Sequence, residues 1–242
     1  MTKRPLKSSS NAPFDTLDLR DNLQKFLDTP FDDPATGAAR QVGNFKWGVY
    51  AFYDYDGEPI YVGQTNEMLR TRIRRHLTNQ RTDAVAMSVL DPFEVLDIEV
   101  WPLPQFQNTS GKDGAARAHL NALESTIVDR AIRESRFNAI LNEKDAPIRV
   151  MDVTIPASCR MRIVSQNVYD LRRHADLRLA RRASVVARLS QVISEREVKG
   201  GLRRSLVTQT KRLNWLAERR FQELGGAASV EREDGPEDDS AA

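Results

Sequence analysis

Two short apolar strands joined by an Asp-Gly pair constrain the fold of this chain more than any other feature. Residues 48–63 read GVYAFYDYDGEPIYVG, in which Asp56-Gly57 is a typical two-residue turn of a β-hairpin. A turn at this pair places Tyr50 opposite Gly63 on the neighbouring strand. The sequence therefore predicts an antiparallel hairpin whose register can be checked against its own side chains.

This register divides the hairpin's side chains between two faces. Opposed residues point to one face, and so do alternate residues along each strand. One face carries Tyr50, Phe52, Tyr61 and Gly63, and the other carries Val49, Ala51, Tyr53, Ile60 and Val62. The second set is an apolar core face, whereas the first brings two phenols together and leaves only a glycine opposite Tyr50, where a side chain would crowd the ring. An ordinary hairpin explains the alternation, but not two hydroxyl groups beside a basic segment.

A basic helix is expected directly after the hairpin, at about residues 67–79. Apolar side chains recur every four residues and form its buried stripe, which consists of Leu69, Ile73 and Leu77. Arg72 and His76 are also four residues apart, so they lie together on the neighbouring face. A solvated basic face is the ordinary interpretation of such a pattern.

A third strand and a long helix are expected next. Residues 93–103 alternate between apolar and acidic side chains, and residues 115–135 have a helical apolar stripe that contains Glu124. A carboxylate in such a stripe loses hydration at a cost of several kcal/mol unless a positive group compensates for it. From the residues alone, a structural salt bridge is the simplest explanation of Glu124.

Together these motifs resemble the GIY-YIG nuclease family. Residues 48–50 (GVY) are followed after ten residues by 61–63 (YVG), and then by a helix with an arginine and a late histidine. The resemblance covers residues 45–147. It implies an α/β fold, or α+β under a stricter definition, with a small mixed or antiparallel three-stranded sheet flanked by helices. It also implies hydrolysis of phosphodiester bonds.

The resemblance implies a set of catalytic residues, which are Tyr50, Tyr61, Arg72, His76, Glu124 and Asn138. Arg70 and Arg74 are alternatives for the arginine if the helix register differs. Asn142 is the second choice for the asparagine, whose role would be to fix the backbone or a water molecule. Gln64 follows YVG directly. The family has lysine or another polar residue at this position, and because glutamine carries no charge, the sequence does not support a charge-based role for Gln64.

The chemistry of phosphodiester hydrolysis suggests a role for each group. Glu124 would hold one Mg²⁺ or Mn²⁺ ion, because magnesium keeps most of its waters and takes other contacts from phosphate. Arg72 would contact the scissile phosphate as a permanently charged donor. Tyr50, helped by His76, would activate water if nearby positive charge lowers its pKa. Tyr61 would position water or phosphate, and the two tyrosine roles could be exchanged.

Composition excludes several classes of protein. No apolar run is long enough to span a bilayer, and the start of the chain lacks the apolar core of a signal peptide. The single cysteine, Cys159, excludes a disulfide framework and a Cys-rich zinc site, so a cytoplasmic location is expected. The formal net charge of +2 is too close to balance to indicate a partner.

We divide the chain into six segments. These are a disordered basic arm (1–13), an N-terminal helix and loop (14–44), the nuclease domain (45–147), a linker (148–157), a basic helical domain (158–225) and a disordered acidic tail (226–242). Gly200-Gly201 divides the basic domain into a helical hairpin. The arginines expected to contact DNA are Arg172, Arg173, Arg181, Arg182, Arg203 and Arg204. The alternative is a packing or dimerisation domain with solvated arginines.

The sequence thus predicts a metal-dependent DNA endonuclease, of restriction or homing type by analogy with the family. One alternative is a DNA-binding protein with a nuclease-like fold that lacks catalysis. Another is a nuclease that acts in repair or on RNA. DNA is the expected partner, and a two-fold symmetric target would imply a homodimer.

Overall fold

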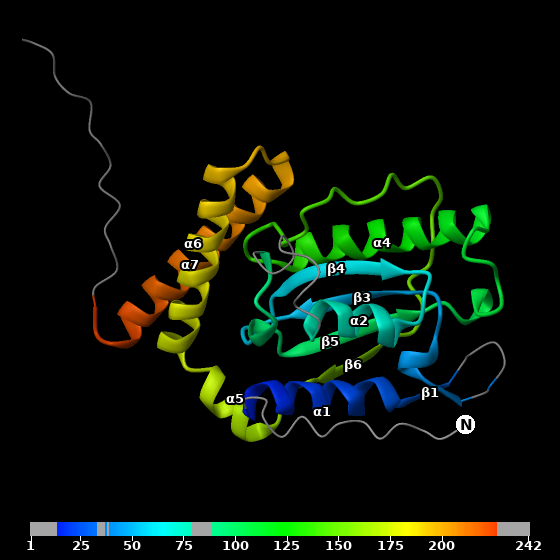
Figure 1. Ribbon diagram of the computed structural model, residues 1–242, viewed down its shortest axis with the longest axis horizontal. Helices are drawn as coiled ribbons and strands as arrows, with labels where there is room; N and C mark the ends of the chain where they lie inside the picture. The colour runs from blue at the N-terminus through cyan, green and yellow to red at the C-terminus, as the bar shows by residue number, and fades with distance from the viewer. Residues whose placement is uncertain (1–13, 33–36, 38, 79–88, 227–242) are drawn as a thin grey trace, which may run out of the picture.

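The computed structural model describes most of the chain (Figure 1). The described residues are 14–32, 37, 39–78 and 89–226. The predicted basic arm and nearly all of the predicted acidic tail lie outside these ranges. In the described part of the chain, no helix is long and apolar enough to cross a membrane.

In the described residues, α1 is followed by four strands, the middle of the chain alternates between helix and strand, and the last three elements are helices. The helices are α1 (Phe14–Asp28), α2 (Leu69–Leu77), α4 (Gly114–Glu134), α5 (Gln166–Arg172), α6 (Ala175–Glu195) and α7 (Gly200–Glu223). The strands are β1 (Pro30–Asp32), β2 (Ala39–Gln41), β3 (Gly48–Tyr53), β4 (Pro59–Thr65), β5 (Asp97–Pro102) and β6 (Cys159–Arg162). Short 3₁₀ helices lie at Val42–Asn44, Pro92–Glu94 and Pro104–Phe106. The predicted basic helix, third strand and long helix all occur: the basic helix and the strand are shorter than predicted, and the long helix begins and ends one residue earlier.

The hairpin of β3 and β4 has the predicted register but a different turn. Tyr50 pairs with Gly63, as expected, whereas Tyr53 pairs with Pro59 because the register shifts at a bulge. The connection is the five-residue loop 54–58 rather than a two-residue Asp-Gly turn. Asp54 explains the longer loop, because its carboxylate accepts the backbone N–H groups of Asp56 at 2.8 Å and of Glu58 at 3.1 Å.

The central sheet has four antiparallel strands in the order β4-β3-β5-β6. The three-stranded prediction missed β6, which pairs with β5 from Asp97↔Arg162 to Val100↔Cys159. The predicted helical domain 158–225 therefore begins with a strand of the central sheet. Residues 148–157 do not separate two independent units, since Val153 and Ile155 pack against the core beneath α4.

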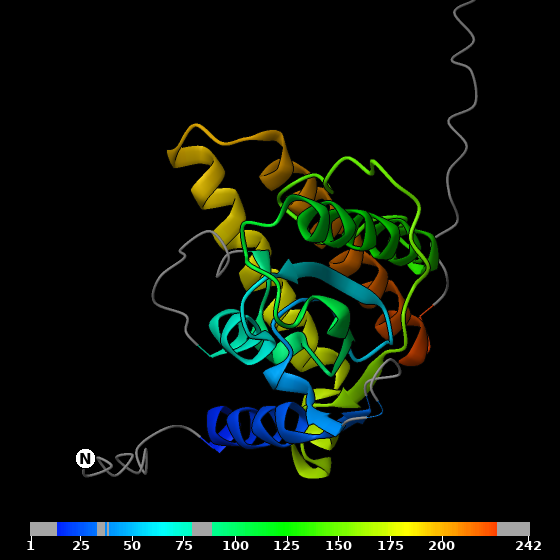
Figure 2. The same ribbon diagram turned by 90° about the vertical axis from the view of Figure 1, so that its right-hand side faces the viewer.

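Helices cover both faces of this sheet (Figures 1 and 2). On one face, α4 packs over a cluster that includes Val49 and Trp101. On the other face, α1 and α2 pack over a cluster that includes Tyr50 and Phe52. Ile60 belongs to this second cluster, not to the face predicted for it, because the bulge changes the side to which it points.

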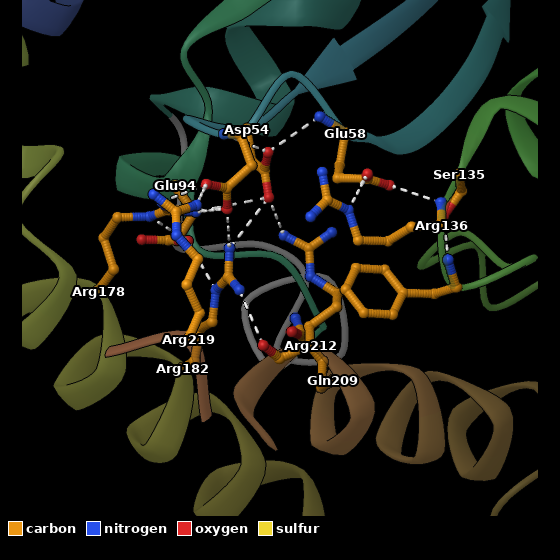
Figure 3. Close-up of polar contacts among 12 residues, drawn as sticks. Asp54, Glu58, Glu94, Ser135, Arg136, Arg178, Arg182, Gln209, Arg212 and Arg219 are labelled. Atoms are coloured by element: carbon orange, nitrogen blue, oxygen red, sulfur yellow. Dashed lines mark hydrogen bonds and ion pairs between the residues drawn. The ribbon is translucent and has the colours of Figure 1, made fainter. Parts of the chain in front are cut away.

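The helical hairpin α6–α7 lies at the end of the sheet where the 54–58 loop emerges (Figure 1). It is joined to the sheet by a buried set of charges, which we call the arginine–carboxylate cluster (Figure 3). The cluster consists of Asp54, Asp56, Glu94, Arg178, Arg182 and Arg212. At the start of α7, a Cβ atom on Gly201 would lie 1.6 Å from the carbonyl oxygen of Glu143, so this close approach requires glycine.

Candidate active site

A cleft of about 570 Å³ opens beside the edge strand β4. Its walls come from β4, α2, α4, α6 and the segment 141–147. Among the predicted site residues, the cleft is lined by Tyr61, Arg72, His76, Glu124 and Asn142. Residues more than 80 positions apart in the chain therefore converge on one concave surface.

Tyr50 lies beneath this cleft and does not line it. Its side chain is completely buried in the cluster covered by α1 and α2. A Cβ atom on Gly63 would lie 2.5 Å from the Tyr50 hydroxyl oxygen, which confirms that any side chain opposite Tyr50 would crowd it. Tyr61, two residues before Gly63 on β4, is partly exposed and faces the cleft.

Arg72 is held at the cleft by its place on α2. The predicted stripe of Leu69, Ile73 and Leu77 is buried, so Arg72 falls on the flank of the helix that faces β3 and β4. Its Nε donates a hydrogen bond of 3.3 Å to the hydroxyl oxygen of Tyr50. This contact fixes the guanidinium between the buried phenol and the cleft.

The two alternative arginines of α2 are engaged elsewhere. Arg70 pairs with Asp28 at 3.1 Å and donates to Asn44 at 2.9 Å, so it ties α2 to the end of α1. Arg74 donates to Gln24 on α1. Of the three arginines considered, Arg72 is the one that lines the cleft.

His76 completes an aromatic cluster at the base of the cleft. Its ring centroid lies 5.4 Å from that of Tyr61, 5.9 Å from that of Tyr50 and 6.4 Å from that of Phe52. The imidazole thus lies one helical turn after Arg72 on the same flank of α2, as its spacing predicts. It also lines the cleft beside Tyr61.

The electrostatics of the tyrosines overturn one predicted role. Burial raises the pKa of Tyr50 well above its ordinary value of 10, the neighbouring Tyr61 raises it further, and Arg72 offsets only part of this. Burial also raises the pKa of Tyr61 to about 12. The prediction that positive charge would lower the Tyr50 pKa is therefore wrong, because desolvation outweighs the single arginine.

Glu124 is the carboxylate on α4 that reaches the cleft. Asp113 caps this helix by accepting the N–H of Ala116 at 2.8 Å. Burial raises the pKa of Glu124 to about 7, although the charges of Arg72 and Lys144 act in the opposite direction. A structural salt bridge does not account for this carboxylate, since no ion pair within 4 Å involves it among the described residues.

The donor set at Glu124 fits a cation that needs few protein ligands. Within the described ranges, no group of three or more His, Cys, Asp or Glu side chains could hold a metal ion. Transition metals bound entirely by protein are therefore a poor fit to this site. Mg²⁺ is a better fit, because it is commonly held by one or two carboxylates and completes its shell with water and phosphate.

Of the two candidate asparagines, Asn142 lines the cleft and Asn138 does not. Asn142 Oδ1 accepts the N–H of Val62 at 3.1 Å, and its Nδ2 donates to the carbonyl of Val62 at 2.7 Å. Asn138 is exposed, has a left-handed φ of 50°, and does not line the cleft. Asn138 thus closes the turn after α4, whereas Asn142 pairs with the free edge of β4.

Two of the arginines predicted to contact DNA are buried. The side chains of Arg172 and Arg182 are only 3% and 2% exposed. Arg172 pairs with Asp15 at 3.4 Å, and Arg182 pairs with Asp54 at 3.0 Å and with Glu94 at 3.1 Å. DNA contact is wrong for these two residues, because Asp15 of α1 already pairs with Arg172, and Asp54 and Glu94 already pair with Arg182.

The other four arginines that were predicted to contact DNA are exposed to solvent to different extents. Arg173, Arg203 and Arg204 are exposed, and Arg204 pairs with Asp145 at 2.5 Å. Arg181 is partly exposed and lines the cleft. Sequence reasoning missed three further cations there, Arg75, Lys144 and Arg188, and the places of Lys144 and Arg188 depend on how distant segments pack.

Comparison with known families agrees with the motifs on β3, β4 and α2. Residues 46–105 match the family model described as the GIY-YIG catalytic domain. This region is therefore similar to the catalytic domain of a nuclease family. No curated protein and no solved structure matches the chain. Glu124 and Asn142 lie outside the matched residues, so their assignment to the site rests on the geometry of the cleft.

Proposed function

We propose that this chain is a DNA endonuclease that hydrolyses phosphodiester bonds with the help of one Mg²⁺ or Mn²⁺ ion. The observation that carries the proposal is the convergence of Arg72, His76 and Glu124 on one cleft of a GIY-YIG domain. Phosphodiester hydrolysis needs positive charge at the phosphate, a proton acceptor for water and help for the leaving oxygen. These residues supply such groups from two elements of the fold, α2 and α4.

Glu124 is the residue that would hold the metal ion. When bound, the ion would supply positive charge to the phosphoryl oxygens and lower the pKa of a coordinated water. Cation binding requires the ionised carboxylate, which the site disfavours because burial raises the Glu124 pKa to about 7. Binding of the metal and loss of the Glu124 proton are therefore coupled.

Arg72 is the phosphate-binding group that the protein itself provides. A guanidinium stays charged at any physiological pH and presents several donors in one plane. The hydrogen bond of 3.3 Å from its Nε to Tyr50 leaves the terminal nitrogens available to phosphate oxygens. Tyr50 is thus a positioning residue, which corrects its predicted role as the base.

Tyr61 and His76 are the groups best placed to handle the attacking water. Both line the cleft, and their ring centroids are 5.4 Å apart. A neutral imidazole can accept the proton of water, whereas the phenol of Tyr61, with its pKa of about 12, stays neutral and can orient water by hydrogen bonding. This assignment keeps the predicted role of Tyr61 and makes His76, rather than Tyr50, the proton acceptor.

Asn142 supports the site from the outer side of β4. By pairing with both backbone groups of Val62, it occupies the hydrogen-bonding positions that another strand would take. The adjacent residues Tyr61 and Gly63 are thereby fixed relative to Arg72. We further propose a restriction or homing setting, supported by the basic helices that adjoin the catalytic domain.

Cleavage of supercoiled plasmid DNA tests this function. The parent should nick and linearise plasmid with Mg²⁺ or Mn²⁺ but not with EDTA, whereas Glu124→Ala and Arg72→Ala should be inactive. Arg133→Ala is a matched control, because Arg133 is an exposed arginine on α4 that does not line the cleft. It should cut like the parent. A parent that binds DNA but cuts under no condition would contradict the proposal, and so would metal-independent cutting.

Competition between substrates tests the choice of DNA. Unlabelled duplex DNA should suppress cutting of a labelled plasmid fragment at lower concentrations than single-stranded or duplex RNA of equal length. If RNA competes better and is itself cleaved, the chain is an RNA-directed nuclease and the DNA assignment is wrong.

A further inference from the structure

Helix α6 is anchored to the catalytic domain along one side. Its buried residues are Arg178, Arg182, Val185 and Leu189, which recur every three or four positions and form a single stripe. Arg178 makes two hydrogen bonds to the Asp56 carboxylate, at 3.0 and 2.5 Å. Figure 3 shows Arg178 and Arg182 reaching from α6 to the loop that connects β3 and β4. The helix is thus held in a fixed position beside the sheet.

A second side of α6 borders the cleft. Arg181 and Arg188 both line it, and they are seven residues apart, so they project from the same flank two turns from each other. At 1.5 Å per residue, their backbone positions are separated by about 10 Å along the helix axis. This flank lies beside the buried stripe, so the anchoring of the stripe also determines where the two arginines point.

The two arginines differ in how far their charge is already balanced. Arg181 pairs with Asp91 at 3.4 Å and lies over the ring of Phe93, with 4.8 Å from Cζ to the ring centroid. Arg188 is exposed and donates to the carbonyl of Ser184 at 3.4 Å. Among the described residues, no carboxylate lies within ion-pair distance of Arg188. Its charge therefore remains available to a ligand in the cleft.

The opposite walls of the cleft also carry cations, beside the carboxylates of Glu143 and Asp145. Arg72 on α2 and Lys144 on the segment after α4 line it, and neither forms an ion pair among the described residues. Three cations without a carboxylate partner thus surround the Glu124 site from three elements of the fold. A polyanion with regularly spaced charges, such as a nucleic-acid backbone, matches this distribution better than a single small anion does.

We infer that α6 forms a wall of the DNA-binding cleft and that Arg188 binds a backbone phosphate of the strand presented to Arg72. This inference rests on the proposed endonuclease function and extends it to a residue outside the matched catalytic domain. An exposed arginine on a helix is ordinarily only solvated. Arg188 differs because it faces a cleft and sits on a helix fixed by buried ion pairs, so less conformational entropy is lost when it binds.

The salt dependence of DNA binding tests this contact without any need for cleavage. Binding of a fluorescent duplex is measured in EDTA between 50 and 200 mM NaCl by anisotropy, and the slope of log K against log salt is determined. Each lost phosphate contact reduces the magnitude of the slope by about 0.9. Arg188→Ala should show this reduction and about 5- to 10-fold weaker binding at 100 mM salt, whereas Arg188→Lys should keep the slope.

Arg133→Ala provides the control, because it removes an exposed arginine of α4 outside the cleft. It should bind with the parent slope, and all three variants should unfold at the parent temperature because both sites are exposed. An unchanged slope for Arg188→Ala would overturn the inference even if the parent cuts plasmid. Equal losses for Arg188→Ala and Arg133→Ala would also overturn it, since the effect would then be one of overall charge. Absence of cleavage by the parent would refute the enzyme function separately.

Discussion

A Cβ atom on Gly63 would lie 2.5 Å from the hydroxyl oxygen of Tyr50, a separation that real side chains do not adopt. Tyr50 in turn accepts the hydrogen bond of 3.3 Å from Arg72. The glycine on β4 therefore determines where the phenol on β3 can sit, and the phenol determines where the guanidinium points. The absence of a side chain at Gly63 is thus linked to the position of the Arg72 guanidinium on α2.

Gly63→Ala tests this link. The added methyl group forces the Tyr50 ring to move within a packed cluster, so the free energy of unfolding should fall by about 1–3 kcal/mol. The displaced phenol should also misplace Arg72, and a misplacement of about 1 Å can reduce the rate by about 100-fold. Urea denaturation and plasmid cleavage measure the two effects.

Gly111→Ala is the control for this substitution. A Cβ atom there meets its nearest neighbour, Asn66 Nδ2, at an ordinary 3.5 Å. Both stability and cleavage should be unchanged. If Gly63→Ala behaves like Gly111→Ala, the proposed link between Gly63 and Arg72 is wrong.

The two candidate asparagines can be separated by mutation. Asn142→Ala leaves the N–H and carbonyl of Val62 without their side-chain partner, which should cost about 1–3 kcal/mol and lower the cleavage rate. Asn138→Gly keeps the left-handed backbone that φ = 50° requires, so stability and cleavage should stay near those of the parent. Loss of cutting by Asn138→Gly with full cutting by Asn142→Ala would reverse the assignment.

The arginine–carboxylate cluster should be a major source of stability for the docking of α6 and α7. Asp54→Asn keeps the Oδ1 acceptor of the loop but removes the charge that Arg182 and Arg212 contact at 3.0 and 2.7 Å. Breaking a buried ion pair costs about 3–5 kcal/mol. Chemical denaturation should therefore show a loss of this size.

The exposed pair of Arg130 and Glu134 on α4 provides a comparison. Glu134→Gln should change the free energy of unfolding by less than about 0.5 kcal/mol, because such a pair is screened by solvent. Equal effects of Asp54→Asn and Glu134→Gln would show that the cluster does not hold α6 and α7 in place.

The pH dependence of stability tests the environment of Glu124. Its pKa rises from 4.5 to about 7 on folding, so ionisation in the folded state is unfavourable. Stability should therefore fall as pH rises from 4.5 to 7, by up to about 3 kcal/mol, and then level off. Glu124→Gln should lack this decrease, so its advantage over the parent should appear above pH 7 and vanish near pH 4.5.

Mg²⁺ adds a second readout to the same comparison. Because binding needs the carboxylate, Mg²⁺ should raise the unfolding temperature of the parent at pH 8 more than at pH 5. Glu124→Gln should show no such rise at either pH. A parent whose stability does not respond to Mg²⁺ at pH 8 would contradict the assignment of the metal to Glu124.

Local sequence patterns predicted the parts of the structure that depend on neighbouring residues. The pairing of Tyr50 with Gly63 and the buried stripe of α2 follow from strand alternation and helical spacing, and both are confirmed. The bulge before Tyr53 was missed, because it results from Asp54 capping its own loop. A side-chain hydrogen bond of this kind leaves no periodic signal.

The arrangement of the arginines could not be predicted for a different reason. An arginine that contacts DNA and an arginine buried against carboxylates look alike in a basic helix. Arg182 is distinguished only by its partners Asp54 and Glu94, which lie more than 80 residues earlier in the chain. The position of Arg188 in the cleft depends on the same long-range packing.

The single-turnover rate of DNA cleavage by Glu124→Gln tests the central claim most directly. The substitution keeps the size of the side chain but removes the charge that would hold the metal ion. With Mg²⁺ at pH 8, the rate should fall at least about 100-fold, while DNA affinity in EDTA should stay within about 3-fold of the parent. A rate equal to that of the parent would contradict the account, because the cleft around Glu124 would then not be the site of cleavage.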